Sequence, residues 1–176
     1  MKKLFTFTTC VVLFVSMFCV CYSENKGKLG VVGSKIIEPA MIISREDASV
    51  LTGVSFGECT VKEQPVVGLK LCVYEKDGAF LQLGLTQAAF MDKKGGNTPE
   101  SIYNSIKGGF EDAVKIEGVG DDNFIAPPGL HIMKDGYYMT ISLGIMTKDR
   151  EKLKAAGMKA VENLGKYVQK GGQATW

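Results

Sequence analysis

Two stretches of this sequence decide the fold: GLKLCVYEKDGAFLQLGLTQ at residues 68–87 and GLHIMKDGYYMTISLGIMT at residues 129–147. Each contains an Asp-Gly pair, at 77–78 or 135–136, between two runs in which apolar residues alternate with other residues. Alternation with a period of two is typical of a strand with one buried face, and an Asp-Gly pair between two such runs indicates a tight turn. The sequence therefore predicts two β-hairpins.

The two hairpins resemble each other in their opening Gly-Leu, their Lys-Asp-Gly turn and a Leu-Gly near the end, once a short gap is allowed. Each also follows a predicted helix. We interpret this as a duplicated unit of one helix plus strands. The alternative is that any two amphipathic hairpins with Asp-Gly turns look alike. The predicted fold class is α+β, with a single antiparallel sheet, helices packed on its Leu/Ile face, two duplicated helix-plus-strands units and a long C-terminal helix.

Three segments carry helix signals. The first is predicted at 44–52, where Ser44 supplies a capping hydroxyl. The second begins at Thr98, and the third and longest begins after Thr147 and ends before Gly171. Apolar residues at spacings of three and four define the expected buried sides of the second and third helices. These residues are Ile102, Tyr103, Ile106, Leu153, Ala156, Ala160, Val161, Leu164 and Val168.

The N-terminal segment MKKLFTFTTCVVLFVSMFCVCYS has two lysines, an apolar run and small residues at its end, which is the pattern of a signal peptide. We therefore expect a signal peptide at 1–23, a flexible lead at 24–35 that is rich in Gly, Lys and Ser, and a single α+β domain at 36–176. The protein is expected to be exported to the periplasm or the extracellular space.

Two other interpretations of the N-terminal segment are a membrane anchor and a lipoprotein signal. An anchor usually needs about 20 apolar residues, and this run is shorter and interrupted by Thr and Ser. Lipidation at Cys19 or Cys21 would need Leu and small residues before the cysteine, and neither site fits well. We therefore predict no stable membrane insertion after cleavage of the signal.

The charge balance argues against nucleic-acid binding. Two of the 21 Lys and Arg residues lie in the signal, which leaves 19 basic against 19 acidic side chains in the exported chain. Proteins that bind nucleic acid carry a basic surface that neutralises phosphates, and no basic stripe is present in this sequence. No polybasic segment for an anionic membrane surface follows the signal either.

The cysteine count predicts one disulfide. Of five cysteines, three lie in the signal, so the exported chain keeps only Cys59 and Cys72. An even pair in an oxidising compartment favours a disulfide, and the turn residues Gln64-Pro65-Val66 at the midpoint would place the two cysteines opposite each other in a hairpin. The alternative is two buried free thiols. A metal site is not expected, because His131 is the only histidine and no set of four ligands has a familiar spacing.

The order of several short motifs resembles a known group of proteins. A capped helix ends in Leu-Thr-Gly, a hairpin contains a cysteine, and GVGD at 118–121 precedes NFIA at 123–126 and a Lys-Asp-Gly hairpin. Over residues 40–168 this layout is similar to small exported bacterial proteins of unknown function, often lipoproteins, and to the extracellular sensor domain of mycobacterial serine/threonine kinases. The resemblance implies an exported α+β sensor or binding domain and supplies no catalytic residue. The chain departs from the lipoproteins in lacking a good lipidation site.

Other motifs do not predict catalysis. The loop at 118–122 could suggest a phosphate or calcium site, but a phosphate loop needs a following helix, and the residues after it read as extended. Calcium needs about six oxygen ligands, and this loop offers few. His131 could move a proton, but no serine nucleophile motif accompanies it. We expect no enzymatic activity and no cofactor.

The solvent-facing side of the predicted sheet is the candidate binding face. Alternation of side chains gathers aromatic rings and hydroxyls there, a combination that suits a polar ligand or a protein partner. The alternative is an ordinary solvated sheet face, on which Thr and Tyr are common. The candidate residues are Lys70, Tyr74, Phe80, Gln82, Thr86, His131, Tyr138, Thr140 and Ser142.

Together these patterns predict an exported binding or sensor-type domain that recognises a small molecule or an envelope protein. A second hypothesis is a secreted interaction or enzyme-inhibitor module that uses the same face. A third is a hydrolase whose site the sequence does not reveal.

Overall fold

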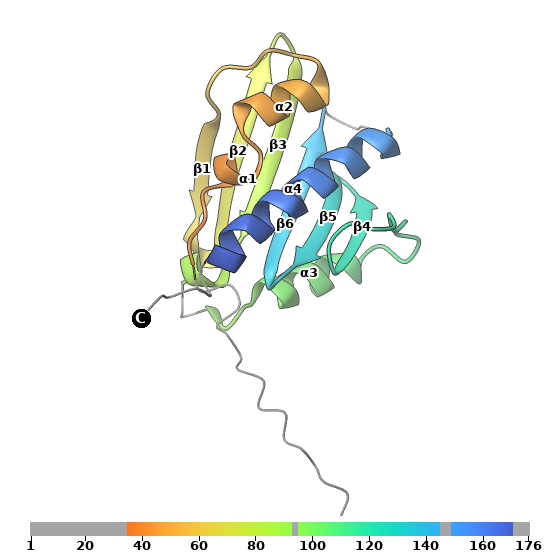
Figure 1. The fold of residues 1–176 in the computed structure, drawn as a ribbon. Helices are drawn as coiled ribbons and strands as arrows, with labels where there is room; N and C mark the ends of the chain where they lie inside the picture. Colours follow the sequence, from red (N-terminus) through yellow and green to blue (C-terminus); the bar gives the residue numbers. More distant parts are fainter. Residues whose placement is uncertain (1–34, 93–94, 145–148, 171–176) are drawn as a thin grey trace, which may run out of the picture.

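The computed structural model describes residues 35–92, 95–144 and 149–170. The predicted signal peptide and all of the predicted lead except Lys35 lie outside these residues. The described chain forms one six-stranded antiparallel sheet in the order β1-β2-β3-β6-β5-β4, with helices on both of its faces (Figure 1). This confirms the α+β class. The strands are β1 (Thr60–Gln64), β2 (Leu69–Lys76), β3 (Ala79–Thr86), β4 (Asp122–Ala126), β5 (Gly129–Lys134) and β6 (Tyr137–Leu143). The helices are α1 (Pro39–Ile42), α2 (Arg45–Thr52), α3 (Pro99–Lys107) and α4 (Arg150–Lys170), with short 3-10 turns η1 (Pro65–Val67) and η2 (Ala88–Phe90).

The sheet consists of two three-stranded halves, β1–β3 and β4–β6, that meet where β3 pairs with β6. In both predicted hairpins the turn has positive φ at Asp and Gly, 50° and 80° at residues 77–78 and 48° and 74° at 135–136. Such turns match the twist of the flanking strands, which explains the tight connections. Both predicted hairpins, β2–β3 and β5–β6, are therefore confirmed.

The two hairpins also have the same register. When the Asp-Gly turns are superimposed, Tyr74 becomes equivalent to Ile132 and Leu81 to Met139, and each of these pairs is directly opposed in its own hairpin. The same equivalence matches Leu83 with Ile141, and these two residues pair with each other between β3 and β6. An approximate two-fold axis therefore passes through the Leu83–Ile141 pair, normal to the sheet.

One face of the sheet, which we call the inner face, is covered by α1, α2 and α4 (Figure 1). It carries Leu83 and Ile141, and the core between sheet and helices is apolar. The long helix α4 approaches the strands closely, since a Cβ at Gly157 would lie 2.7 Å from Leu130 Cδ2. The fully buried core residues include Ile42, Ile43, Ala48, Leu81, Leu83, Leu85, Leu130, Ile132, Met139, Ile141, Ala156, Ala160 and Leu164.

Helix α2 begins and ends as the sequence predicts. The Ser44 hydroxyl accepts a hydrogen bond from the Asp47 N–H at 3.1 Å, and the Asp47 carboxylate accepts one from the Ser44 N–H at 3.2 Å, which completes a capping box. Gly53 ends the helix in the left-handed conformation.

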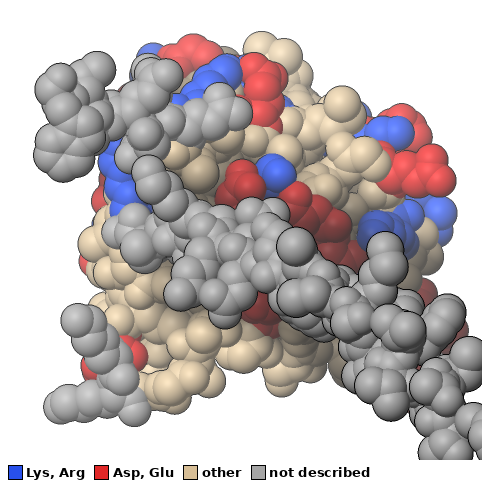
Figure 2. Space-filling view, turned by 60° about the horizontal axis from the view of Figure 1, so that its bottom comes forward, with Lys and Arg blue, Asp and Glu red and all other residues tan. Residues whose placement is uncertain are grey.

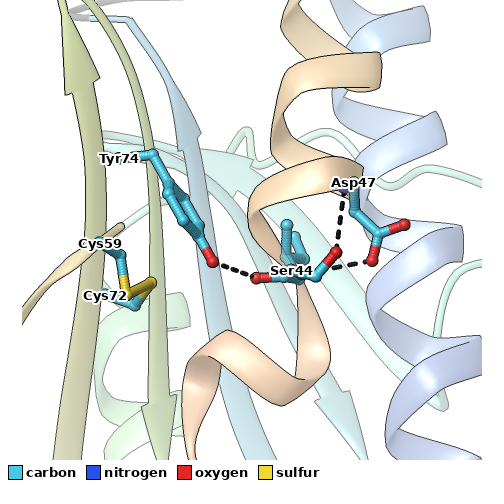
Figure 3. The surroundings of a disulfide bond; sticks show 6 residues. Ser44, Asp47, Cys59, Cys72 and Tyr74 are labelled. Carbon is cyan, nitrogen blue, oxygen red and sulfur yellow. Dashed lines mark hydrogen bonds between the residues drawn. A yellow bond between two sulfur atoms is a disulfide. The ribbon is translucent and has the colours of Figure 1, made fainter. Parts of the chain in front are cut away.

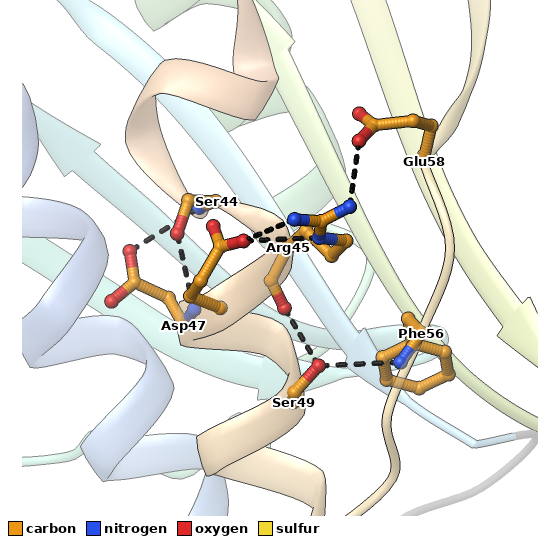
Figure 4. Close-up of polar contacts among 7 residues, drawn as sticks. Ser44, Arg45, Asp47, Ser49, Phe56 and Glu58 are labelled. Carbon is orange, nitrogen blue, oxygen red and sulfur yellow. Dashed lines mark hydrogen bonds and ion pairs between the residues drawn. The ribbon is translucent and has the colours of Figure 1, made fainter.

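Polar contacts attach the start of α2 to the loop that follows it (Figure 4). Arg45 donates to the carboxylates of Glu46 and Glu58, and the Ser49 hydroxyl donates to the Arg45 carbonyl and accepts from the Phe56 N–H. The loop is thereby directed toward β1.

The disulfide between Cys59 and Cys72 is present, with a Cα–Cα distance of 5.6 Å (Figure 3). The sequence predicts that the two cysteines lie directly opposite each other in the hairpin, and this part of the prediction is wrong. The turn between β1 and β2 extends to Gly68, so that Cys72 pairs with Val61 and Cys59 lies just before the strand. The disulfide therefore crosses the ladder diagonally and joins the chain before β1 to the centre of β2.

Helix α3 lies on the opposite face of the sheet from α1, α2 and α4 (Figure 1). It begins where the sequence predicts, with a capping box at Thr98 and Ser101. The sheet positions that it contacts include Phe124 and Tyr138, which point away from the inner-face core. The prediction that the helices pack on one face therefore holds for three of the four described helices, and α3 is the exception.

Candidate functional site

The face of the sheet opposite the inner face, which we call the outer face, carries seven of the nine candidate binding residues. The strand register decides this, because residues directly opposed in a ladder share a face. The seven are Phe80, Gln82, Thr86, His131, Tyr138, Thr140 and Ser142. Only some of them reach solvent.

The prediction is wrong for the other two candidates, Lys70 and Tyr74, because both lie on the inner face. Lys70 pairs with Leu85, and Tyr74 pairs with Leu81. The Lys70 ammonium is buried and forms ion pairs with Glu38 and Glu63. The hydrogen bonds that Lys70 donates to these carboxylates raise its pKa. The Tyr74 hydroxyl donates to the Ile43 carbonyl at 2.7 Å (Figure 3), and burial raises its pKa to about 12.

The outer face of β4–β6 is closed by α3, and we call this part of the sheet the closed half. Tyr103 of α3 packs edge-on against Tyr138 with ring centroids 5.5 Å apart, and against Phe124 at 5.2 Å. Ile102 and Ile106 pack at the border of the same cluster. As a result, Tyr138 is only 4% exposed and cannot present its ring to a ligand.

His131 lies within the closed half. Its ring stacks on Phe124 with centroids 4.4 Å apart, and the residue is 2% exposed. Its Nε2 is 3.2 Å from the Ala126 carbonyl and its Nδ1 is 2.7 Å from the Tyr138 hydroxyl. A neutral ring with the proton on Nε2 donates to the carbonyl and accepts from Tyr138. Burial lowers the pKa of His131, so the neutral form is favoured.

A polar cluster borders the closed half at the first residue of β4, Asp122. Asp122 forms ion pairs with Lys107 of α3 and with Lys115. Burial alone would raise the pKa of Asp122, but hydrogen bonds from the two lysines lower it to about 2. Next to this cluster is a hollow of about 300 Å³ lined by Glu100, Tyr103, Asn104, Asp121, Asp122, Met133 and Gly136. The ion pair between Lys107 and Asp122 holds the C-terminal end of α3 on the sheet.

Thr86 and Ser142 face outward but are buried. The Ser142 hydroxyl donates to the carbonyls of Pro128 or Gly144, so it satisfies the backbone at the ends of two strands. Phe80, Gln82 and Thr140 remain partly exposed. The structure therefore does not gather the predicted residues on one accessible face, and it leaves three of them available.

Phe80 and Gln82 lie on the outer face of β1–β3, which we call the open half, and Thr140 of β6 borders it. The helix that contacts β2 and β3, α1, lies on the inner face, and α3 contacts β5 and β6 (Figure 1). The side chains of Leu69, Leu71 and Val73 alternate along β2 on this open half, and all three are partly exposed. Together with Phe80 they form an apolar stripe.

Polar groups surround this stripe. Thr60, Lys62 and Gln64 of the edge strand β1 are exposed and, by register, share the outer face with Val73, Leu71 and Leu69 respectively. Glu75 is exposed at the upper end of β2. An apolar centre within a polar rim is the usual composition of a protein-interaction surface.

Sequence reasoning missed Leu69, Leu71 and Val73 as outward-facing residues, and it missed Asp122 as the anchor of α3. A signal for the first group was present. Leu69, Leu71 and Val73 alternate with Lys70, Cys72 and Tyr74, so both faces of β2 are apolar enough for burial. Strands of that kind are usually covered on both sides.

Basic and acidic side chains are interspersed on the end of the molecule seen in Figure 2. Among the residues that the structure describes, no group of three or more His, Cys, Asp or Glu side chains could hold a metal ion. Within the same residues, no helix is long and apolar enough to cross a membrane.

Comparison of the chain with protein-family models, with curated proteins and with solved structures gives no match. The resemblance to exported sensor domains therefore stays a prediction.

Proposed function

We propose that this protein is an exported binding domain that recognises a partner protein through the open half of its sheet. The observation that carries the proposal is the apolar stripe of Leu69, Leu71 and Val73 on β2 and Phe80 on β3, which is partly exposed although the opposite faces of both strands are packed in the core. A contiguous apolar patch with a polar rim marks an interaction site on a protein surface. The hydroxyl and amide of Thr140 and Gln82 at its border can supply hydrogen bonds that orient the partner.

The same observation favours a protein over a small molecule. Small ligands bind in concave sites that bury most of their surface. The open half is one face of a sheet, and its residues are spread over three strands (Figure 1). Its composition and extent suit a protein segment that covers several side chains at once.

Site-specific photo-crosslinking tests this proposal. A photoreactive phenylalanine analogue at Gln82, in the exported protein in its own cells, is expected to give a cross-linked product that mass spectrometry identifies. The matched control carries the analogue at Met158, which is 50% exposed on α4. The partner is then purified and titrated against wild-type protein and the Phe80→Ser variant.

We expect the Phe80→Ser change to weaken the identified partner's binding about tenfold or more, the size of effect that an apolar interface anchor gives. Far-ultraviolet circular dichroism checks that the variant is folded. Equal cross-linking from Gln82 and Met158, or an affinity that Phe80→Ser leaves unchanged, contradicts the proposal.

A further inference from the structure

The internal two-fold axis makes each outward-facing residue of the open hairpin equivalent to one of the closed hairpin. Val73 corresponds to His131, and Phe80 corresponds to Tyr138, because both hairpins have the same register around their Asp-Gly turns. His131 and Tyr138 are buried under α3. At the two positions where the closed half is covered by α3, the open half therefore has the apolar side chains of Val73 and Phe80.

The two surfaces are also continuous. Gln82 of the open half pairs directly with Ser142, and Thr86 pairs with Tyr138, which contacts α3. The established α3 interface thus ends at the β3–β6 pair, where the open half begins. A second helix could lie on the sheet beside α3 without displacing it, because the axis through Leu83 and Ile141 places the two helix positions on opposite sides of that pair.

The charges of the two halves differ in a way that specifies the second helix. Glu75 of the open half corresponds to Met133, which lines the hollow beside α3 together with Glu100 and Asn104. Glu75 is exposed and forms no ion pair with any residue in the described part of the chain. A helix in the equivalent position would bring the residue at the place of Glu100 toward this carboxylate. A basic side chain there is favourable and an acidic one is not.

We infer that the open half binds an amphipathic α-helix of the partner, placed as the symmetry equivalent of α3 and carrying a basic side chain opposite Glu75. The inference rests on the proposed function and names the segment that the surface accepts. The helix presents adjacent apolar residues and a third one turn later, as α3 does with Ile102, Tyr103 and Ile106. Helix-in-groove recognition commonly uses such anchors.

The probe for this inference is a synthetic copy of α3, residues 97–110, with Glu100 replaced by Lys. A hydrocarbon staple between Ser101 and Ser105, which are both exposed, holds the peptide helical and leaves its apolar side free. The peptide is titrated into isotope-labelled exported protein, and NMR chemical shifts are followed. Two matched peptides keep Glu100, or replace both Ile102 and Tyr103 with Ser.

We expect saturable shifts at Leu71, Val73 and Phe80, and none with the double-Ser peptide. The Lys peptide is expected to bind about two- to five-fold more tightly than the Glu peptide, the range for an exposed ion pair. In the Glu75→Lys protein this preference is expected to reverse. Such a reversal identifies the contact between the helix and Glu75.

Three results of the peptide titration overturn the inference: no saturable binding, shifts confined to β4–β6 because the peptide replaces α3, or a charge preference that Glu75→Lys does not reverse. Shifts that depend on protein concentration without peptide also overturn it, since a second copy would then occupy the surface. In each case, a protein captured at Gln82 by photo-crosslinking would still support the binding function. Failure of the helix inference is therefore distinguishable from failure of the proposed function.

Discussion

The two halves of the sheet have the same hairpins but different covers. In the closed half, Tyr138 and His131 lie under α3, and Asp122 holds the end of that helix. In the open half, the equivalent residues Phe80 and Val73 are partly exposed. The hairpin register is set by the turn and repeats faithfully, whereas the cover depends on where the intervening chain returns to the sheet. A repeated strand pattern therefore predicts shared strand geometry and does not predict shared exposure.

The halves also differ in how their outer strands are held. A disulfide joins the chain before β1 to β2. On the other side, Asn123 of β4 accepts from the Ile116 N–H and donates to the Ile116 and Val119 carbonyls, which ties the preceding loop to the edge of the sheet. The outer strand of the open half is thus held by a disulfide, and that of the closed half by the buried hydrogen bonds of Asn123.

The largest expected effects on stability come from substitutions at the approximate two-fold axis, where equivalent residues of the two halves pair with each other. Leu83→Ala and Ile141→Ala each remove a fully buried side chain from the common core. Both are expected to lower the free energy of unfolding by about 2–5 kcal/mol. Urea denaturation measures both. A near-neutral result for one of them would break the symmetry between the hairpins, and Met158→Ala on exposed α4 is the control.

Loss of the disulfide should affect the open half more than the closed half. The Cys59→Ala/Cys72→Ala variant opens a loop with a sequence separation of 13 residues. A loop of this size corresponds to about 3 kcal/mol in the chain-entropy model. Because that entropy belongs to the unfolded chain, amide hydrogen exchange through global unfolding is expected to accelerate in all strands, and exchange through local opening is expected to accelerate additionally in β1 and β2. Equal acceleration in both halves would show that the disulfide has no local effect.

Acid should weaken the closed half through His131. Because burial lowers its folded-state pKa, the unfolded chain binds a proton more readily, and stability is expected to fall as the pH drops below the unfolded pKa of about 6.5. The expected loss is about 1 kcal/mol per pH unit until the folded-state pKa is reached. His131 is the only histidine, so urea midpoints at pH 7 and 5.5 assign the effect. A His131→Phe variant that keeps the same difference would contradict the assignment.

A smaller effect is expected for the ion pairs that hold α3. The pKa of Asp122 is lowered to about 2, so its contribution is present above the unfolded pKa of about 4 and is lost as the pH falls toward 2. Since Asp122 is partly exposed, we expect Asp122→Asn to cost only about 1 kcal/mol at pH 7. Parallel denaturation of both proteins at pH 7 and 2.5 should show the difference shrink. A difference as large at pH 2.5 as at pH 7 would mean that charge is not its source.

The sequence predicted the local elements well because their signals are local. Ser44, Thr98 and the two Asp-Gly turns each determine a helix start or a hairpin through contacts within a few residues. The disulfide was predicted from the number of cysteines and the expected oxidising compartment. The prediction for Lys70 and Tyr74 failed because the faces of β2 were assigned from its own pattern, in which both sets of alternating residues are partly apolar.

The exposure of the candidate face could not be predicted for a different reason. The apolar side of α3, with Ile102, Tyr103 and Ile106, was apparent in the sequence. Which face of the sheet receives that side depends on the path of the chain between β3 and α3, and no local pattern encodes it. His131 and Tyr138 therefore looked like surface residues, although α3 buries them.

The most direct test of the central claim compares Phe80→Ala with Tyr138→Ala, the same kind of substitution at symmetry-equivalent positions in the open and the closed half. Tyr138→Ala should lower the free energy of unfolding by about 3–5 kcal/mol, because it removes a ring packed beneath α3. Phe80→Ala should lower it by about 1 kcal/mol or less, because the Phe80 ring is partly exposed. Equal losses in one urea titration series would mean that the outer face of β1–β3 is covered, and would contradict the account.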